Sequence, residues 1–461
     1  MPPDAHPSTV VVLFTRDLRL HDHPALTAAV ETAHRVVPLF VLDDTILGTF
    51  GSPNRVAFLL ESLVALRDSL RSRGSDLVLR RGDAVDQTLR VALACRAESV
   101  HVSEDVSGFA QARLERLTRA AAGERIEVRV FPGVTVVPTG ELSPAGGTGP
   151  FRVFTPYWNR WRTMPRRSVL PAPGQVPGVG SIDSGRISEM SELALGAPVP
   201  GLPPGGEGEG RSRLARWVRD GLAAYDDRRD DLAAAGTSGL SPYLHFGCLS
   251  ALEVVERARS EPGGEAFVRQ LCWRDFHHQL LASDPASSTR DQRTRGDDWR
   301  DDPHALEAWQ QGRTGYPIVD AGMRQLLTEG VMHNRARLVT ASFLTKHLYI
   351  DWRHGADHFA RHLVDGDVAN NVGNWQWVAG TGADTRPNRV FNPVRQARRF
   401  DADGDYVRRF VPELASVAGP DVHEPWRLGP LWPTGYPARL VEHEKAVARF
   451  LGARAAVASR R

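Results

Sequence analysis

The chain has 461 residues, of which 41% are hydrophobic and 24% charged, a composition typical of a folded globular protein and not of a disordered one. This length exceeds what one ordinary core holds, so we expect two domains. The net charge is only +2, which means that any binding of nucleic acid must depend on a local basic patch.

The cysteines and the N-terminus exclude several classes of protein. Cys95, Cys248 and Cys272 are scattered without metal-type spacing, so we expect neither a disulfide framework nor a metal site. The first ten residues lack the basic and apolar regions of a signal peptide, and no window is long and apolar enough to span a membrane. We therefore expect a soluble, cytoplasmic protein.

Short apolar runs alternate with amphipathic stretches over residues 8–137. This alternation predicts an N-terminal α/β domain with a doubly wound, Rossmann-like parallel sheet, which binds ligands at the carboxyl ends of its strands. No GxGxxG motif follows the first strand, which argues against classical NAD binding. The predicted strands, all expected to be buried, are residues 10–14, 36–42, 76–80, 99–103 and 127–131.

The rest of the chain divides into a connector and a second domain. Residues 138–210 are too rich in proline and glycine for regular elements, so we expect an interdomain linker with one aromatic island at 151–162 that packs down. Residues 211–461 carry apolar residues at helical spacing in successive segments, including 267–281 and 334–350. They predict an all-α domain.

Polar and aromatic side chains crowd together in residues 351–392. Asp365 and Asp367 flank a glycine, Asn371 follows, and Trp375 and Trp377 lie two residues apart. Buried polar groups are costly unless hydrogen-bonded, so this density favours a large, planar, polar ligand. The alternative is a helix-capping turn followed by tryptophans of the core.

Other motifs precede this stretch. Residues 237–247 place hydroxyl groups around a glycine before a helix, where hydroxyls and backbone amides can hold phosphate oxygens, although an ordinary capped loop has the same pattern. Residues 267–281, 297–312 and 314–344 add polar and indole side chains at helical spacing.

Together these stretches resemble the photolyase and cryptochrome family of blue-light flavoproteins over nearly the whole chain. FTRDLRLHDHPAL at 14–26 is similar to the N-terminal signature of that family, and VFNPVRQARRFDADGDYVRRFVPEL at 390–414 to its C-terminal one. The resemblance implies that the helical domain, 211–461, binds FAD in a folded conformation and that the N-terminal domain often holds an antenna chromophore.

The resemblance also implies the residues that bind FAD. One group would hold the phosphates and the ribityl chain, and a second would surround the isoalloxazine and the adenine, with Arg337 paired to Asp365. Asn371 takes the position near flavin N5, where photolyases have Asn and plant cryptochromes Asp, which favours repair. The first group is Tyr225, Thr237, Ser238, Gly239, Leu240 and Ser241, and the second is Asn334, Arg337, Asp365, Asp367 and Asn371.

Three tryptophans match the electron-transfer chain that the family uses between the flavin and the surface. They are Trp375, Trp352 and Trp299. Each could instead be an ordinary core residue, which is the commoner place of Trp.

The substrate implied by the resemblance is UV-damaged DNA whose pyrimidine dimer is flipped out of the duplex. Trp273 and Trp377 match positions that stack on the dimer, Asn334 matches a contact position, and Arg229 and Arg274 are candidates for phosphate contacts or for surface ion pairs.

Two positions depart from the best-studied enzymes for cyclobutane dimers. Gln270 stands where they usually have Glu, and Leu338 where they usually have Met. A glutamine at position 270 resembles the pattern of (6-4) photolyases and animal cryptochromes. Those relatives, however, place histidines where this chain has Asn334 and Leu338. Repair of cyclobutane pyrimidine dimers is therefore the favoured function. Gln270 would then form the hydrogen bonds to the dimer in place of the usual Glu, with a lower rate of repair.

The antenna and the rival functions stay open at this stage. The antenna crevice would lie near residues 54–58 and 103–113, with 8-hydroxy-5-deazaflavin or methenyltetrahydrofolate as ligand, or it could be packed shut. The main rival function is a cryptochrome-like photoreceptor, against which the short C-terminal end counts, and a third is a nucleotide-binding module attached to a structural helical domain. We expect a monomer, because one chain suffices for this chemistry.

Overall fold

The computed structural model describes residues 8–458 except 145, 148, 235, 430, 431, 433 and 434. The chain forms two compact units. The first comprises Met1–Pro198, Pro203–Ala223 and Ser238–Pro285, and the second comprises Val199–Leu202, Ala224–Thr237 and Ala286–Arg461. The chain thus passes between the units several times. The domain boundaries at residues 137 and 210, inferred from the sequence, stay a prediction.

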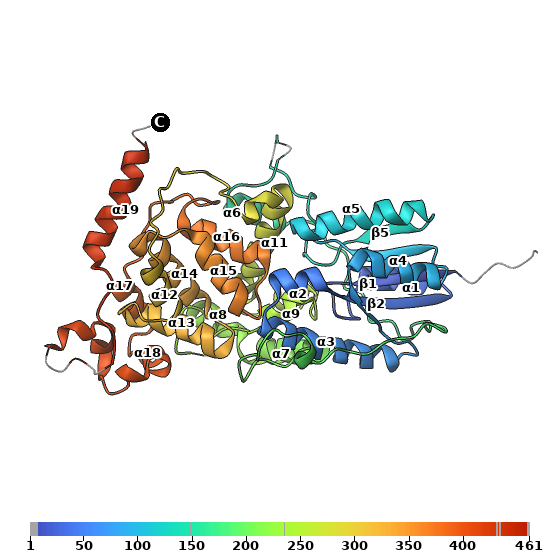
Figure 1. The fold of residues 1–461 in the computed structure, drawn as a ribbon, viewed down its shortest axis with the longest axis horizontal. Coiled ribbons are helices and arrows are strands. Elements are labelled where there is room, and N and C mark those ends of the chain that lie inside the picture. Colours follow the sequence, from blue (N-terminus) through green and yellow to red (C-terminus); the bar gives the residue numbers. More distant parts are fainter. Residues whose placement is uncertain are drawn as a thin grey trace, which may run out of the picture. The chain divides into compact units, whose positions relative to one another are not determined.

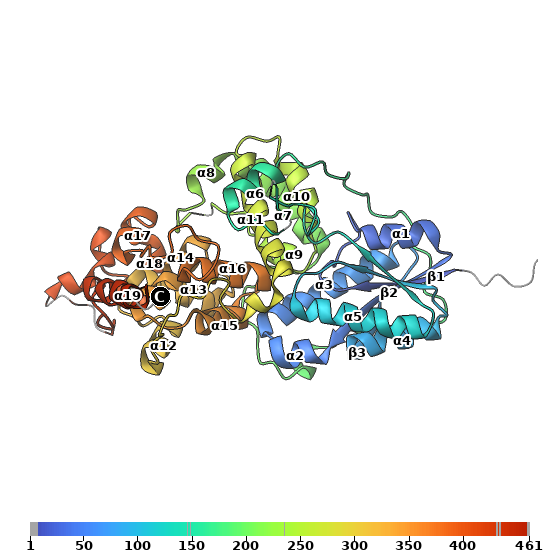
Figure 2. The same ribbon diagram turned by 90° about the horizontal axis from the view of Figure 1, so that it is seen from above.

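A parallel five-stranded sheet forms the core of the first unit. Its order is β3-β2-β1-β4-β5, so the order reverses between β1 and β4, as in doubly wound folds. In Figure 2, α1 lies on one face of the sheet and α4 and α5 on the other. The strands are β1 (Thr9–Phe14), β2 (Arg35–Asp43), β3 (Val78–Gly82), β4 (Ser99–Ser103) and β5 (Glu127–Phe131).

Most of the predicted α/β pattern is confirmed, with three corrections. The strand predicted at 76–80 as buried is β3 at Val78–Gly82, an edge strand whose Arg81 is exposed. The strand at 127–131 was expected to be buried, but β5 is an edge strand whose Val130 is 46% exposed. The short helix α2, whose N-cap residue Asp43 accepts hydrogen bonds from the N–H groups of Thr45 and Ile46, was not predicted, because seven residues carry too little periodicity. The helices are α1 (Pro24–Thr32), α2 (Asp44–Phe50), α3 (Pro53–Arg71), α4 (Ala84–Ala94) and α5 (Gly108–Gly123).

The proline- and glycine-rich stretch holds its predicted aromatic island. Residues 151–162 contain α6 (Phe154–Trp161), which buries Tyr157, Trp158 and Trp161 and contacts α11 (Gly264–Ser283). Asp275 of α11 fixes this contact, because its buried carboxylate accepts the Trp161 indole N–H and the backbone N–H of Val136 and Val137. The island is therefore a packed element of the first unit, which also contains α7 (Glu207–Asp220), α9 (Ser241–His245) and α10 (Ala251–Ala258).

The second unit is helical and has its own hydrophobic core, which includes Trp309, Trp352 and Trp375. Figure 1 shows α13, α14, α15 and α16 side by side, and these helices contact one another. Its α-helices are α8 (Tyr225–Arg228), α12 (Pro303–Gln310), α13 (Pro317–Glu329), α14 (Asn334–Ser342), α15 (Trp352–His362), α16 (Val368–Ala379), α17 (Pro393–Phe400), α18 (Asp405–Phe410) and α19 (His443–Ala458).

One predicted helix changes its winding. Residues 334–350 were expected to be one helix, but α14 ends at Ser342 and a π-helical turn follows at Phe343–Leu348. Tyr349 then adopts a left-handed conformation with φ 57°. Such departures from α-helical winding often occur at functional sites.

The described residues show neither a membrane-spanning helix nor a metal-binding cluster. Within the described residues, no helix is long and apolar enough to cross a bilayer. Over the same part of the chain, no group of three or more His, Cys, Asp or Glu side chains could hold a metal ion.

Candidate functional site: a polar face on α14 and α16

A partly buried ion pair links α14 to the turn before α16. Arg337 Nη2 lies 2.9 Å from Asp365 Oδ2 and 3.1 Å from Oδ1, and the side chain of Asp365 is only 5% exposed. Arg337 Nε also donates to the carbonyl of Met332. The pairing that the resemblance implied is therefore present, and the guanidinium is fixed at both ends.

The DGD turn acts as the N-terminal cap of α16. Asp367 Oδ1 accepts hydrogen bonds from the backbone N–H and the side-chain amide of Asn370, at 2.8 and 2.7 Å. Asn371 is half-buried on the first turn, and its Nδ2 donates to the carbonyl of Ala356 on α15. The capping alternative is thus correct for Asp367, whereas Asp365 and Asn371 have other roles.

Several polar atoms at this face suit a flavin. Buried atoms that lack a hydrogen-bond partner among the described residues include Trp375 Nε1 and His333 Nε2. Guanidinium, carboxylate, carboxamide and indole groups together match the ring nitrogens and carbonyls of an isoalloxazine. Asn334, the first residue of α14, is exposed beside this set.

The predicted phosphate loop combines hydroxyls with a glycine turn. Ser238 Oγ accepts the N–H of Leu240 at 3.4 Å, Gly239 has φ +63°, and Ser241 begins α9. The Leu240 side chain is buried, whereas Thr237 and Ser241 are exposed. The two hydroxyls are therefore accessible to a ligand.

Tyr225 begins α8 and is 8% exposed. Burial raises the pKa of its phenol to about 12, so it stays neutral and can donate a hydrogen bond. Arg229 follows it one turn later, lies 5.9 Å from the Tyr225 ring centroid and pairs with Asp226 at 3.2 Å. Arg229 therefore forms an ion pair, which is one of the two roles predicted for it.

The three tryptophans that are predicted to form the electron relay differ in exposure. Trp375 and Trp352 are 2% and 0% exposed in the core, whereas Trp299 is only partly buried against it. The Trp375 indole packs so closely against Gly355 of α15 that a Cβ there would clash with it, and Gly355 lies one turn from Trp352 on the same helix. Trp352 Nε1 donates to Asp291 at 2.9 Å, and Arg353 lies over its ring at 4.8 Å.

A cavity of about 370 Å³ opens beside this face of the second unit. Leu338 on α14 and Trp377 on α16, both predicted to contact the substrate, line it together. Arginines stack on its aromatic walls: Arg389 lies 4.8 Å from the Trp377 ring centroid, and Arg399 lies 5.0 Å from that of Phe400. Indole faces and guanidinium groups are the surfaces that bind bases and phosphates of nucleic acids.

The remaining predicted substrate residues belong to the first unit, on α11. Trp273 is stacked on Phe154, with ring centroids 3.7 Å apart and an angle of 6° between the planes. Gln270 is half-buried one turn earlier. Arg274 is only 9% exposed and donates to the carbonyl of Val134 at 2.6 Å, so its guanidinium also supports the fold of this unit.

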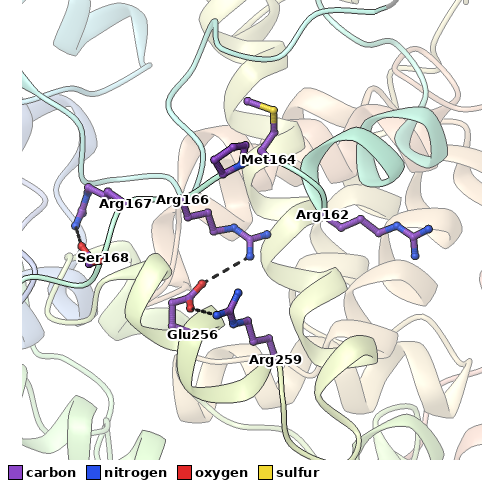
Figure 3. A pocket seen from close by; sticks show the side chains of 8 residues that line it. Arg162, Met164, Arg166, Arg167, Ser168, Glu256 and Arg259 are labelled. Carbon is purple, nitrogen blue, oxygen red and sulfur yellow. Dashed lines mark hydrogen bonds and ion pairs between the residues drawn. The ribbon is translucent and has the colours of Figure 1, made fainter.

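A second cavity, of about 310 Å³, lies in the first unit and has an arginine-rich lining (Figure 3). Glu256 lies between Arg166 and Arg259 there, at 3.7 and 2.9 Å, and Arg167 is engaged with Asp22. One carboxylate does not balance two guanidinium groups, and Arg162 also lines the cavity, so the lining keeps a net positive charge.

Sequence reasoning missed the arginines of the 370 Å³ cavity. Arg335, Arg389 and Arg399 line it beside the predicted Leu338 and Trp377. The signal was present in the basic run VRQARRF, whose helical spacing puts Arg395 and Arg399 on one face of α17.

Known proteins resemble this chain over most of its length. The model described as "FAD binding domain of DNA photolyase" matches residues 267–456, and the model "DNA photolyase" matches residues 10–175. A deoxyribodipyrimidine photo-lyase of Streptomyces griseus is 52% identical over 97% of this chain and 99% of its own.

Two solved structures resemble the whole fold. A class III photolyase from Agrobacterium tumefaciens has a TM-score of 0.91 and 34% identity, covering 100% of this chain and 99% of its own. A cryptochrome from Synechocystis has a TM-score of 0.89 and 28% identity, covering 97% and 99%.

Proposed function

Because the chain belongs to the photolyase and cryptochrome family, we propose that it is a light-dependent DNA repair enzyme that binds FAD and splits cyclobutane pyrimidine dimers. The observation that carries this proposal is the cavity shared by Leu338 and Trp377, which arginines line beside the polar face of α14 and α16. A signalling protein would not need a nucleic-acid surface at this place.

In this proposal, Arg337, Asp365 and Asn371 hold the isoalloxazine, and the hydroxyls of Thr237, Ser238 and Ser241 receive the phosphates. FAD, when bound, supplies the light absorption and the one-electron chemistry. The fixed guanidinium of Arg337 orients Asp365, and Asn371 presents an amide of which one N–H is already used by Ala356.

The cavity would position the flipped pyrimidine dimer. Trp377 offers an indole face to a flipped dimer, and Arg389 behind it adds positive charge near the DNA backbone. Leu338 contributes an apolar wall that excludes water from the reacting bases. Gln270 and Trp273 of α11 are proposed as further contacts to the dimer.

An antenna chromophore is a separate part of the proposal. Asn54 and Phe58, which mark the predicted crevice, lie on α3 and are 4% and 1% exposed. An 8-hydroxy-5-deazaflavin or a methenyltetrahydrofolate would widen the absorption of the enzyme. Heat-released chromophore, separated and identified by its absorption spectrum, would decide between the two or reveal neither.

The deciding experiment is blue-light repair of oligonucleotides that carry one cyclobutane dimer or one (6-4) lesion, with photoreduced protein and a dark control. We expect repair of the cyclobutane dimer only, and its loss in Trp377→Ala. The matched control is Trp426→Ala: this half-buried tryptophan also lies under an arginine, with Arg439 at 4.4 Å, but does not line the cavity.

Each outcome has a distinct meaning. Repair of the (6-4) lesion alone would replace the substrate with the (6-4) photoproduct. A protein whose flavin reduces in light but which repairs neither lesion would be a photoreceptor, as the similarity to a cryptochrome allows. Equal loss of repair in both tryptophan variants would contradict the role of the cavity.

A further inference from the structure

The 310 Å³ cavity of the first unit joins two segments that are far apart in the sequence. Residues 162–168 follow α6, and Glu256 and Arg259 belong to the last turn of α10 and its C-cap. Figure 3 shows the guanidinium groups of Arg166 and Arg259 reaching toward Glu256 from these two segments. The cavity therefore brings three charged side chains together at one place.

The lining of this cavity carries more positive than negative charge. Its one carboxylate, that of Glu256, is accompanied by three arginines, which are Arg162, Arg166 and Arg259. A fourth arginine, Arg167, is already held by a carboxylate outside the lining. A recess with an excess of one charge concentrates ions of the opposite sign, so this cavity attracts anions.

Arg166 is the least exposed charged side chain of the lining. It is 10% exposed, and its Cζ lies 4.5 Å from the ring centroid of Trp161, which is fully buried. The Arg166 Nε is buried and has no hydrogen-bond partner among the described residues, and its Nη1 comes no closer to Glu256 than 3.7 Å, beyond hydrogen-bond distance. Buried polar groups are nearly always satisfied, and one that is not can mark the place of an ion.

Glu256 satisfies only one of its two arginine neighbours. Its Oε2 lies 2.9 Å from Arg259 Nη2, whereas its Oε1 is buried without a hydrogen-bond partner in the described part of the chain. Burial lowers the pKa of Arg166, and the charge of Arg259 adds to this effect, although Glu256 opposes it. The guanidinium of Arg166 is thus incompletely stabilised, and a bound anion would stabilise it.

Phosphate is the anion that these side chains suit best. Guanidinium groups bind phosphate through pairs of parallel hydrogen bonds, and the hydroxyl of Ser168, which also lines the cavity, can donate another. The lining that the structure describes contains no aromatic side chain on which a base could stack. The volume of about 310 Å³ is at the small end of the range of about 300–1,000 Å³ for ligand sites. These features favour a compact polyanion.

We propose that this cavity binds a di- or triphosphate, either inorganic pyrophosphate or the phosphate tail of a nucleotide. Phosphate oxygens bind the guanidinium groups of Arg166 and Arg259, and Glu256 competes with the ligand for both. A DNA duplex does not suit the site, because a stiff duplex cannot enter a recess to reach a side chain that is 10% exposed. The site lies within the first unit and does not depend on lesion repair.

The test is isothermal titration calorimetry of the full-length, FAD-loaded protein with pyrophosphate, ADP or an undamaged duplex oligonucleotide. Divalent cations are left out because they bind pyrophosphate. The salt concentration is about 0.15 M, at which attraction to exposed charges is largely screened. We expect one pyrophosphate per chain, and ADP of similar affinity because the base is not recognised.

Substitutions in the lining should change this affinity in opposite directions. Arg166→Gln should lower it by about tenfold, as expected for the loss of one charge-assisted hydrogen bond. Arg166→Lys, which keeps the charge above Trp161, should retain its flavin and still bind more weakly than the wild type, because it lacks the planar fork. Glu256→Gln should raise the affinity by about tenfold, a gain that a misfolded protein would not show.

Two control variants show where the ligand binds. Arg257 lies on α10 beside Glu256 and is 3.9 Å from Glu253, but it does not line the cavity, so Arg257→Gln should leave the affinity for pyrophosphate unchanged. Arg399→Ala removes a guanidinium from the 370 Å³ cavity of the second unit and should also leave it unchanged.

Each contrary result would overturn the proposal. Absence of binding heat with both pyrophosphate and ADP would exclude the site. Equal losses of affinity in Arg166→Gln and Arg257→Gln would show a general attraction to positive charge, and a loss in Arg399→Ala alone would place the ligand in the second unit. Weaker duplex binding in Arg166→Gln, without any binding of pyrophosphate, would make the cavity a contact for DNA. Lesion repair is measured separately, so none of these results decides the proposed function.

Discussion

Arg337 and Asp365 form a two-point ion pair, with Nη2 of the arginine 2.9 and 3.1 Å from the two carboxylate oxygens. The arginine side chain is 27% exposed and the aspartate 5%, so the pair lies at the inner wall of the proposed flavin site. Its geometry constrains both the fold and the cofactor.

Arg337→Ala should therefore lower both the folding stability and the flavin content of the protein. It leaves the Asp365 carboxylate buried without its partner, which costs about 3 kcal/mol of folding stability, at the lower end for broken buried pairs because the arginine is partly exposed. Flavin content is read from the ratio of visible to ultraviolet absorbance, and stability from urea unfolding of the flavin-free protein. The control, Arg361→Ala, breaks an exposed pair with Asp357 and should change neither. Unchanged flavin content in Arg337→Ala would remove this residue from the site.

Trp375→Phe should stop photoreduction of the flavin and leave repair by chemically reduced protein intact, because the relay is needed only to supply the electron. Trp309→Phe is the matched control. Trp309 is equally buried, and its ring centroid lies 6.0 Å from that of Trp375, but it is not a predicted relay member. The measurement is the rate of flavin bleaching under blue light with an external thiol. Equal loss in both variants would mean that packing of the core, and not the relay, sets the rate.

The predicted ion pair between Arg337 and Asp365 is present in the structure, whereas several features around it were not predicted. Motifs such as Asp365-Gly-Asp367 carry short-range information, and the pairing of Asp365 with Arg337 follows from the family resemblance. The aromatic island at 151–162 was expected to pack, but its partner, Asp275, could not be predicted because a helical carboxylate usually faces solvent. Periodicity also cannot reveal an edge strand such as β5, because exposure depends on which strands pair.

Tyr349 illustrates the limit most clearly. Apolar spacing continues through residues 334–350, so nothing in the pattern indicates that the helix widens at Phe343 and ends in a left-handed residue. The contact between Tyr349 and Trp299 joins residues fifty positions apart. Only the folded chain brings them together.

The arginines of the cavity should set the salt dependence of DNA binding. Arg389→Ala and Arg399→Ala should each lower the slope of log affinity against log salt by about one, as expected when a single phosphate contact is lost. The measurement is fluorescence anisotropy with dimer-containing and undamaged DNA at several salt concentrations. Arg116→Ala is the control, because this exposed arginine of α5 pairs with Asp83. A slope unchanged in all three variants would place the DNA elsewhere.

Buried histidines should make the protein less stable in acid. Burial lowers the pKa of His358 and of His347 to about 3 and that of His333 to about 4, from an ordinary value of 6.5. Below pH 6.5 the unfolded chain binds protons at these positions and the folded chain does not, so their contribution is fully present above pH 6.5 and is lost as the pH falls toward 4.

His358→Gln should remove one of these contributions. Between pH 7 and pH 5, the variant should lose about 2 kcal/mol less of its free energy of unfolding than the wild type loses. Burial raises the pKa of Asp401 to about 6. Its effect on the pH dependence of stability has the opposite sign to that of the histidines, because its contribution is lost as the pH rises through 6. The comparison of variant with wild type cancels that common part. Parallel pH profiles for the two proteins, from urea unfolding followed by tryptophan fluorescence, would contradict the prediction.

Gln270→Glu tests whether the amide on α11 limits the enzyme. A carboxylate forms stronger hydrogen bonds to base edges than a carboxamide, by about 1 kcal/mol, so dimer-containing DNA should bind about fivefold tighter. The added negative charge acts in the other direction on every DNA, which makes undamaged DNA the reference. The control variant, Gln311→Glu, adds the same charge at an exposed position of the second unit, just after α12. If the ratio of affinities for damaged and undamaged DNA rises only in Gln270→Glu, Gln270 contacts the lesion. If the ratio is the same in both variants, the side chain at position 270 does not contact the dimer, and its amide has no bearing on the choice of lesion.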